Sequence, residues 1–174
     1  VDYQYDGVGN LLDITQTGGW QNATSRTYDA VNRLETEVID YGPFTKNVSY
    51  TYDGVGNILT LTDPDGQVLT YGYDPLDRVQ LVTDHLGRQT STIYDPAGRV
   101  TETHYAHGVR TAYQYDNIDQ TTQITTRDAA NALISQYDYA YDPAGQLLSA
   151  FNNGLKEAVY QYDAVGQLTG ADYT

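Results

Sequence analysis

The chain has 174 residues, of which 23 are acidic and nine are basic, so its formal net charge is −14. This charge excludes the basic surface that nucleic-acid binding requires, and it opposes docking on anionic membranes. The absence of cysteine excludes disulfides and thiolate metal sites, and no apolar run is long enough to span a membrane, so we expect neither a nucleic-acid partner nor direct membrane insertion.

The apolar composition favours strands. Tyrosine supplies 18 residues, whereas Met is absent and Phe occurs twice. A tyrosine ring carries a large hydrophobic area, and Tyr, Thr and Val all suit the half-buried, pleated environment of a sheet. We therefore predict an all-β fold. Because the chain lacks a starting Met and both of its ends fall inside a repeating pattern, we also expect it to be a section of a longer protein.

The dipeptide Tyr-Asp opens the same short pattern eight times, at intervals of 21 to 26 residues. A fixed period of this size is the signature of a fold that stacks one supersecondary unit on the next. We therefore predict a single repeat array over residues 1–174, with its function on the assembled surface and not in a catalytic pocket. The eight pairs are Tyr5-Asp6, Tyr28-Asp29, Tyr52-Asp53, Tyr73-Asp74, Tyr94-Asp95, Tyr115-Asp116, Tyr141-Asp142 and Tyr162-Asp163.

Each unit is predicted to run strand, turn, strand, turn. The first strand ends at the key tyrosine, and the following Asp is expected to accept N–H bonds from the turn. The fourth position after the tyrosine holds only Gly, Asn or Asp, the residues that best tolerate positive φ, so we predict a left-handed residue there. Its members are Gly9, Asn32, Gly56, Asp77, Gly98, Asp119, Gly145 and Gly166.

The fifth position after the tyrosine always carries a side-chain N–H donor. We hypothesise that this donor reaches a turn carbonyl or an Asp of a neighbouring repeat and ties adjacent units together. The sixth position is apolar in seven of the eight units and begins the second strand. The fifth-position residues are Asn10, Arg33, Asn57, Arg78, Arg99, Gln120, Gln146 and Gln167.

A second tyrosine often lies two residues before the key one, which puts both rings on the same face of a strand. Across repeats we expect two tyrosine ladders with aromatic cross-strand pairs. The preferred interpretation is that these rings pack the sheet; the alternative is a glycan-binding surface. The candidate glycan-binding residues are Tyr50, Tyr71, Tyr113, Tyr139 and Tyr160.

A second turn closes most units, 13 or 14 residues past the key tyrosine. Strong hairpin signals stand at Asp63-Pro64-Asp65-Gly66 and at Asn152-Asn153-Gly154, and another glycine marks this turn at Gly18. The unit that begins at Tyr115 is longer and carries Ala129-Ala130-Asn131 there. The result is an antiparallel β-hairpin array of about sixteen strands in a long curved sheet, with open edges that favour edge-to-edge self-association.

These residues closely resemble the YD-repeat, or Rhs, family. The family motif is met by YDPAGRV at Tyr94 and nearly as well by YDGVGNI at Tyr52 and YDPAGQL at Tyr141. The resemblance covers essentially the whole chain. It implies a section of a sheet that spirals into a hollow shell, as in bacterial polymorphic toxins, the B and C components of insecticidal toxin complexes, wall-associated proteins and teneurins.

In the toxin branch, the resemblance implies a shell that encapsulates a C-terminal effector domain released by autoproteolysis. The protease segment that closes such a shell is not recognisable here, since Asp142-Pro143-Ala144-Gly145 lies in an ordinary repeat and is followed by Gln146. The family implies a secreted or cell-surface bacterial protein whose partners are flanking repeats and an enclosed effector. The alternative function is a cell-surface adhesion or carbohydrate-binding repeat surface.

No residue pattern predicts an enzyme, a metal site or a cofactor. His85, His104 and His107 are interpreted as turn residues, although Asp84 or Glu102 offers a third metal ligand. The segment Asp63-Pro64-Asp65-Gly66 resembles a calcium loop but lacks the remaining ligands, so a β-turn is preferred. The row of Tyr-Asp carboxylates is likewise interpreted as structural.

Overall fold

The computed structural model describes residues 1–16 and 22–173, and within these ranges the chain is all-β: sixteen strands and no helix. The predicted fold class is therefore confirmed. The described residues contain no helix that could cross a membrane. The chain divides into two compact units, Val1–Gln89 and Thr90–Thr174. The prediction of a single array over residues 1–174 stays a prediction.

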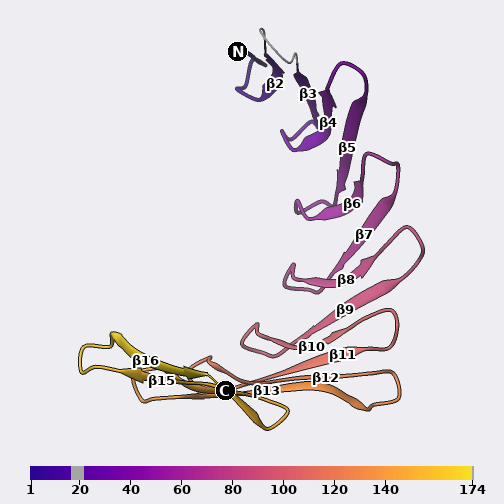
Figure 1. Cartoon of the computed structure of the whole chain (residues 1–174). Coiled ribbons are helices and arrows are strands. Elements are labelled where there is room, and N and C mark those ends of the chain that lie inside the picture. Colours follow the sequence, from indigo (N-terminus) through magenta and orange to yellow (C-terminus); the bar gives the residue numbers. More distant parts are fainter. Residues whose placement is uncertain (17–21, 174) are drawn as a thin grey trace. The chain divides into compact units, whose positions relative to one another are not determined.

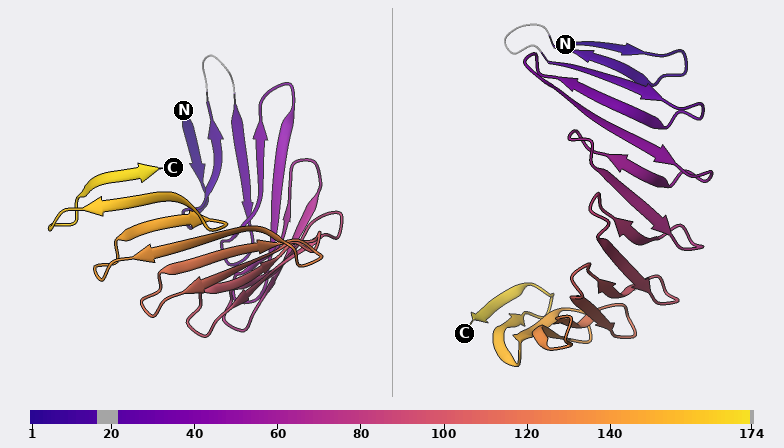
Figure 2. Two further views of the ribbon diagram at one scale, coloured as in Figure 1. Left: turned by 60° about the horizontal axis from the view of Figure 1, so that its bottom comes forward. Right: turned by 90° about the vertical axis from the view of Figure 1, so that its right-hand side faces the viewer.

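The first unit is a sheet of hairpins in which each strand pairs antiparallel with its neighbours in sequence. Figures 1 and 2 show its strands side by side in a single layer. Its strands are β1 (Asp2–Tyr5), β2 (Leu11–Thr15), β3 (Ala23–Tyr28), β4 (Leu34–Asp40), β5 (Thr45–Tyr52), β6 (Ile58–Thr62), β7 (Val68–Tyr73) and β8 (Val79–Thr83).

The second unit repeats this arrangement, again with antiparallel pairing between sequence neighbours. Its longest strand is β13, and the extra length of the unit of Tyr115 lies in β12 and β13, because the turn between them has the same backbone bonds as the other turns. Its strands are β9 (Gln89–Tyr94, of which Gln89 belongs to the first unit), β10 (Val100–His104), β11 (Arg110–Tyr115), β12 (Thr121–Arg127), β13 (Leu133–Tyr141), β14 (Leu147–Asn152), β15 (Leu155–Tyr162) and β16 (Leu168–Tyr173).

The turn after each key tyrosine is a type I turn that ends in a left-handed residue. At Asp95, the carbonyl accepts the N–H of Gly98 at 3.0 Å, and the backbone N–H donates to the Arg99 carbonyl at 2.9 Å. This is the three-residue hairpin loop whose last residue needs positive φ. All eight fourth-position residues have positive φ, from 59° at Asp77 to 108° at Gly56, so the predicted left-handed turn is confirmed.

The opposite ends of the hairpins reuse the same chemistry. Asp63 closes its turn with Gly66 and Gln67 in the way that Asp95 does, and Asn153-Gly154 forms a two-residue loop with both residues at positive φ. Both predicted hairpins are therefore confirmed. Gly18 lies outside the described residues.

One feature that the sequence did not predict is a β-bulge at the same place in every repeat. In the unit of Tyr52, Ile58 lies opposite Tyr52 and Thr60 lies opposite Thr51, which leaves Leu59 without a partner across the hairpin. The same register shift follows the other seven key tyrosines. A bulge locally interrupts ladder pairing and bends the strand.

The core is thin. Among the described residues, Ala150 and Ala158, which lie opposite each other in β14 and β15, are the buried hydrophobic side chains, and Thr111 is the buried polar one. Most other inward-facing side chains are half-buried. Contact between neighbouring hairpins therefore combines half-buried apolar side chains with polar contacts.

The left-handed turn is tested by two glycines in one turn. A β-carbon added to Gly54 or Gly56 meets no atom within 4 Å, but only Gly56 has positive φ. We expect Gly56→Ala to lower the free energy of unfolding by about 1–2 kcal/mol, whereas Gly54→Ala leaves it unchanged or slightly raised. Urea denaturation of both variants measures the difference, and equal midpoints would contradict the assignment.

Candidate functional site

The Asp of each Tyr-Asp pair closes its own turn. Oδ1 of Asp95 accepts the backbone N–H groups of Ala97 and Arg99 at 2.9 and 3.0 Å, and Oδ2 accepts Nε of Arg99 at 2.7 Å. The same two backbone bonds recur at Asp6, Asp29, Asp53, Asp74, Asp116, Asp142 and Asp163. The carboxylates are thus engaged within the turns, as the structural interpretation expects.

The fifth-position side chain extends from this turn to the next repeat. Nη1 of Arg33 donates to the Asp53 carbonyl at 2.8 Å, and Nε2 of Gln120 donates to the Gly145 carbonyl at 2.9 Å. Nη1 of Arg99 donates to the Asp119 carboxylate at 2.7 Å. Asn57 donates in the same way to the Asp77 carboxylate, and Asn10 to the Asn32 side-chain oxygen, both at 2.9 Å. The hypothesis that this position ties adjacent units together is therefore confirmed at these five residues.

Where the fifth residue is arginine, its guanidinium also covers the key tyrosine of the next repeat. The Arg33 guanidinium carbon lies 4.6 Å from the centre of the Tyr52 ring, and that of Arg99 lies 4.7 Å from the Tyr115 ring. Such cation–π contacts contribute about 0.5–1 kcal/mol at exposed sites. Arginine therefore joins two repeats both by hydrogen bonds and by its flat face.

The key tyrosine makes a second connection, in the opposite direction along the chain. Its hydroxyl donates to the carbonyl of the sixth-position residue in the preceding repeat, as at Tyr73, which bonds the Ile58 carbonyl at 2.8 Å. Equivalent bonds of 2.7–3.1 Å join Tyr28 to Leu11, Tyr52 to Leu34, Tyr115 to Val100, Tyr141 to Thr121 and Tyr162 to Leu147.

The β-bulge explains why that carbonyl is available. Pairing between β6 and β7 begins at Thr60, beyond the bulged Leu59, so Ile58 lies outside the ladder on that side. A backbone carbonyl left without a ladder partner needs another donor. The Tyr73 hydroxyl supplies this donor, which couples the bulge of one repeat to the tyrosine of the next.

The candidate glycan-binding tyrosines, Tyr50, Tyr71, Tyr113, Tyr139 and Tyr160, are all half-buried. Their cross-strand neighbours are small or aliphatic: Leu61, Val82, Ile124, Ala150 and Ala171, respectively. None of the five tyrosines lies directly opposite another ring, because each repeat places an aliphatic strand between two tyrosine-bearing ones. One aromatic cross-strand pair does form, diagonally: the Tyr160 ring packs edge-to-face on Tyr173 of β16, with ring centres 6.3 Å apart. Half-burial among aliphatic side chains favours packing, and the glycan-binding role stays a prediction.

The residue at the tip of each turn is apolar, and the structure places it in solvent. At the third position after the key tyrosine, the Val, Leu and Ile side chains are 60–78% exposed. Exposure is a property of the turn, since the side chain at this position projects away from both strands. The residues are Val8, Val31, Val55, Leu76, Ile118 and Val165.

The other candidate ligands do not form a metal site. His85 and His107 are exposed turn residues, as predicted, but the turn assignment of His104 is wrong: it is the half-buried last residue of β10, and its Nε2 lies 2.6 Å from Oε2 of Glu102. In residues 1–16 and 22–173, no group of three His, Asp or Glu side chains could hold a metal ion. Asp63 accepts the N–H groups of Asp65 and Gln67, so this segment is the preferred β-turn.

The hydrogen bonds of the turns change the titration of their carboxylates. The backbone N–H of Arg99 lowers the pKa of Asp95; partial burial opposes this effect, and the Arg99 side chain reinforces it. The side chain of Arg78 likewise lowers the pKa of Asp74. Burial raises the pKa of the Tyr115 hydroxyl, and the neighbouring Tyr113 adds to the rise.

Comparison with known proteins identifies the repeat type to which this geometry belongs. The family model described as RHS Repeat matches residues 52–89, 77–109 and 94–130. Residues 52–130 therefore carry RHS repeats, and the turns in this range are those of successive repeats. No curated protein matches the chain.

Solved structures with the same fold are toxin-complex assemblies. The Tc holotoxin pore of Photorhabdus luminescens is 22% identical over 94% of this chain and 8% of its own, with a TM-score of 0.67. TcdB2-TccC3 without its hypervariable C-terminal region is 18% identical over 97% of this chain and 12% of its own, with a TM-score of 0.76. The chain thus spans about a tenth of these proteins, and the likeness establishes its RHS repeat fold.

The backward connection is tested by removing one hydroxyl. We expect Tyr73→Phe to lower the free energy of unfolding by about 1 kcal/mol, because the Ile58 carbonyl loses its donor. Tyr5→Phe is the matched control, since Tyr5 lies in the first strand and is 59% exposed. Urea denaturation reports both values, and a loss at Tyr5 as large as that at Tyr73 would contradict the role of the bond.

The lowered carboxylate pKa values predict acid sensitivity. Because folding lowers the pKa of Asp95 and Asp74, their stabilising contribution is present above the ordinary aspartate pKa of about 3.9 and is lost as the pH falls through the folded-state value. The melting temperature should therefore fall below about pH 4. The double variant Asp74→Asn/Asp95→Asn should show a shallower fall, and an unchanged slope would exclude these groups as its source.

Proposed function

We propose that the chain is a structural repeat scaffold, a section of a hollow Rhs-type shell that encapsulates or displays a C-terminal effector domain. The observation that carries this proposal is the use of each repeat's chemistry: the Tyr hydroxyl, the Asp carboxylate and the fifth-position donor all bond within or between repeats. Groups used in this way hold the repeats of a structural sheet together. We accordingly propose no catalytic role.

The similarity to toxin-complex structures supports the scaffold role. This chain spans 8–12% of the chains it resembles there, as expected of one section of a wall made from many repeats. The partners we propose are flanking repeats at the open edges of the sheet and an enclosed effector. As in secreted toxin components, we place the parent protein outside the bacterial cell or on its surface.

The alternative is a carbohydrate-binding repeat surface that uses the tyrosine face. It is less well supported, because the five candidate rings are half-buried and lie opposite aliphatic or alanine side chains. A binding surface of stacked aromatics needs accessible ring faces.

Limited proteolysis of the parent protein tests encapsulation. We expect the segment that follows the array to resist trypsin in the native protein and to be cut once urea unfolds the array. Arg99→Gln, which removes the contacts to Tyr115 and Asp119, should bring cleavage to lower urea concentrations. Cleavage of that segment at the same rate with and without urea would rule out encapsulation and leave display.

The same preparation separates the alternative. Binding to immobilised glycans that Tyr139→Ala abolishes, while the resistance to trypsin is unchanged, would favour the carbohydrate-binding surface. We expect no such binding.

A further inference from the structure

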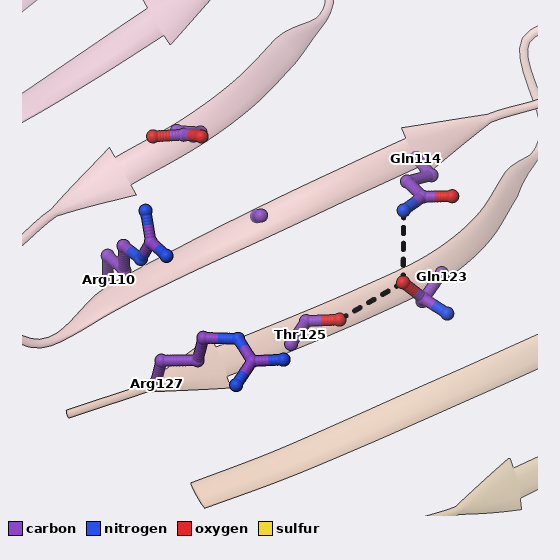
Figure 3. Close-up of a pocket in the computed structure, with 7 residues that line it drawn as sticks. Arg110, Gln114, Gln123, Thr125 and Arg127 are labelled. Atoms are coloured by element: carbon purple, nitrogen blue, oxygen red, sulfur yellow. Dashed lines mark hydrogen bonds between the residues drawn. The ribbon is translucent and has the colours of Figure 1, made fainter. Parts of the chain in front are cut away.

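The second unit carries a polar hollow of about 210 Å³ on the sheet face opposite the tyrosine ladders. Strands β10, β11 and β12 form it, and its floor includes the small side chain of Ala112. Figure 3 shows Arg110 and Arg127 projecting from adjacent strands on the same face. We name it the arginine hollow; its lining residues are Glu102, Arg110, Ala112, Gln114, Gln123, Thr125 and Arg127.

The two arginines are unusual among the basic residues of this chain. The seven others each form an ion pair with a carboxylate. In the ranges that the structure describes, Arg110 and Arg127 form none, although the net charge is −14. They are also direct cross-strand partners, an arrangement in which like charges destabilise a sheet.

Both guanidinium groups converge on one residue. Nη2 of Arg110 donates to Oδ1 of Asn131 at 2.6 Å, and Nη1 of Arg127 donates to the Asn131 carbonyl at 3.2 Å. Asn131 is the left-handed residue of the turn that Asp128 closes, with φ 67°. A guanidinium has five N–H donors, so most of the donors of this pair remain for another acceptor.

The carboxylates near the hollow are already engaged. Asp138 accepts bonds from Gln123 and Gln136, which lower its pKa, and Glu102 lies at hydrogen-bond distance from His104. Gln123 also accepts from Gln114 at 3.0 Å, as Figure 3 shows. Glu102 and Asp138 are thus hydrogen-bonded to His and Gln side chains, and neither forms an ion pair with the two arginines.

We propose that the arginine hollow binds a carboxylate group, from a small organic acid or from an acidic side chain of a peptide. Two guanidinium groups on directly opposed residues of adjacent strands offer donors for the two oxygens of a carboxylate. A singly charged anion is favoured over a phosphate dianion, because Glu102 lines the hollow and the chain as a whole is strongly acidic. Occupancy also relieves the repulsion between the arginines.

Nitrogen-15 NMR of the arginine Nε–H groups in the full chain tests the proposal. Sodium acetate and the capped peptide Gly-Glu-Gly are titrated against sodium chloride and capped Gly-Gln-Gly at matched ionic strength. We expect saturable shifts at Arg110 and Arg127 with the carboxylates. Tighter binding of the peptide identifies an acidic side chain as the source, and equal binding identifies a free acid. Shifts of the same size with chloride, or tighter binding of phosphate than of acetate, would overturn the proposal.

Two variants with opposite expected effects guard against loss of fold. Arg127→Gln should weaken acetate binding about tenfold, and Glu102→Gln should strengthen it roughly two- to fivefold. Arg88→Gln is the matched control, because Arg88 is paired with Asp84 in another turn, and it should leave the affinity unchanged. Equal affinity in Arg127→Gln and the parent chain would show that the hollow does not bind the carboxylate.

Discussion

The array depends on a set of polar contacts between repeats, the polar joint, at one end of every hairpin. The Asp carboxylate fixes the turn, the fifth-position donor reaches forward to the next turn, and the tyrosine hydroxyl reaches back to the preceding bulge. Among its described side chains, the thin sheet fully buries only small ones, two alanines and a threonine, so its large apolar side chains are at most half-buried. The neutral tyrosine bond contributes about 1 kcal/mol, and its repetition along the array makes the joint a substantial part of the stability.

Because the pattern repeats, part of this joint could be predicted from the sequence. Eight aligned copies isolate the fourth position, where only Gly, Asn and Asp occur, and positive φ follows from the stereochemistry of those residues. The same alignment isolates the donor at the fifth position. The acceptor of the Tyr73 hydroxyl could not be predicted, because it depends on the strand register and on the bulge at Leu59. A bulged residue such as Leu59 satisfies strand propensity as well as its unbulged neighbours do, so nothing in the composition marks it.

The cross-strand neighbours of the ladder tyrosines show the same limit. A spacing of two residues correctly implies that Tyr50 and Tyr52 share a face. It cannot say which strand lies beside them. Each hairpin pairs its tyrosine strand with its own aliphatic strand, so Tyr50 meets Leu61 and not a second ring. Half-burial of the rings therefore follows from connectivity, which the periodic pattern alone leaves open.

Because the polar joint is the same in every repeat, a residue that departs from its pattern points to a different role. Arginine at the fifth position pairs with the Asp that closes its own turn, as Arg99 does with Asp95. Asp128 closes the turn that contains Asn131 in the same way, yet Arg110 and Arg127 contact the side-chain amide and the carbonyl of Asn131 instead. The cost of placing like charges opposite each other is tolerable in a sheet whose stability is distributed over many joints. The repeat array can therefore carry a charged site on the sheet face that the tyrosines do not occupy. Residues on that face can vary between repeats without disturbing the polar joint.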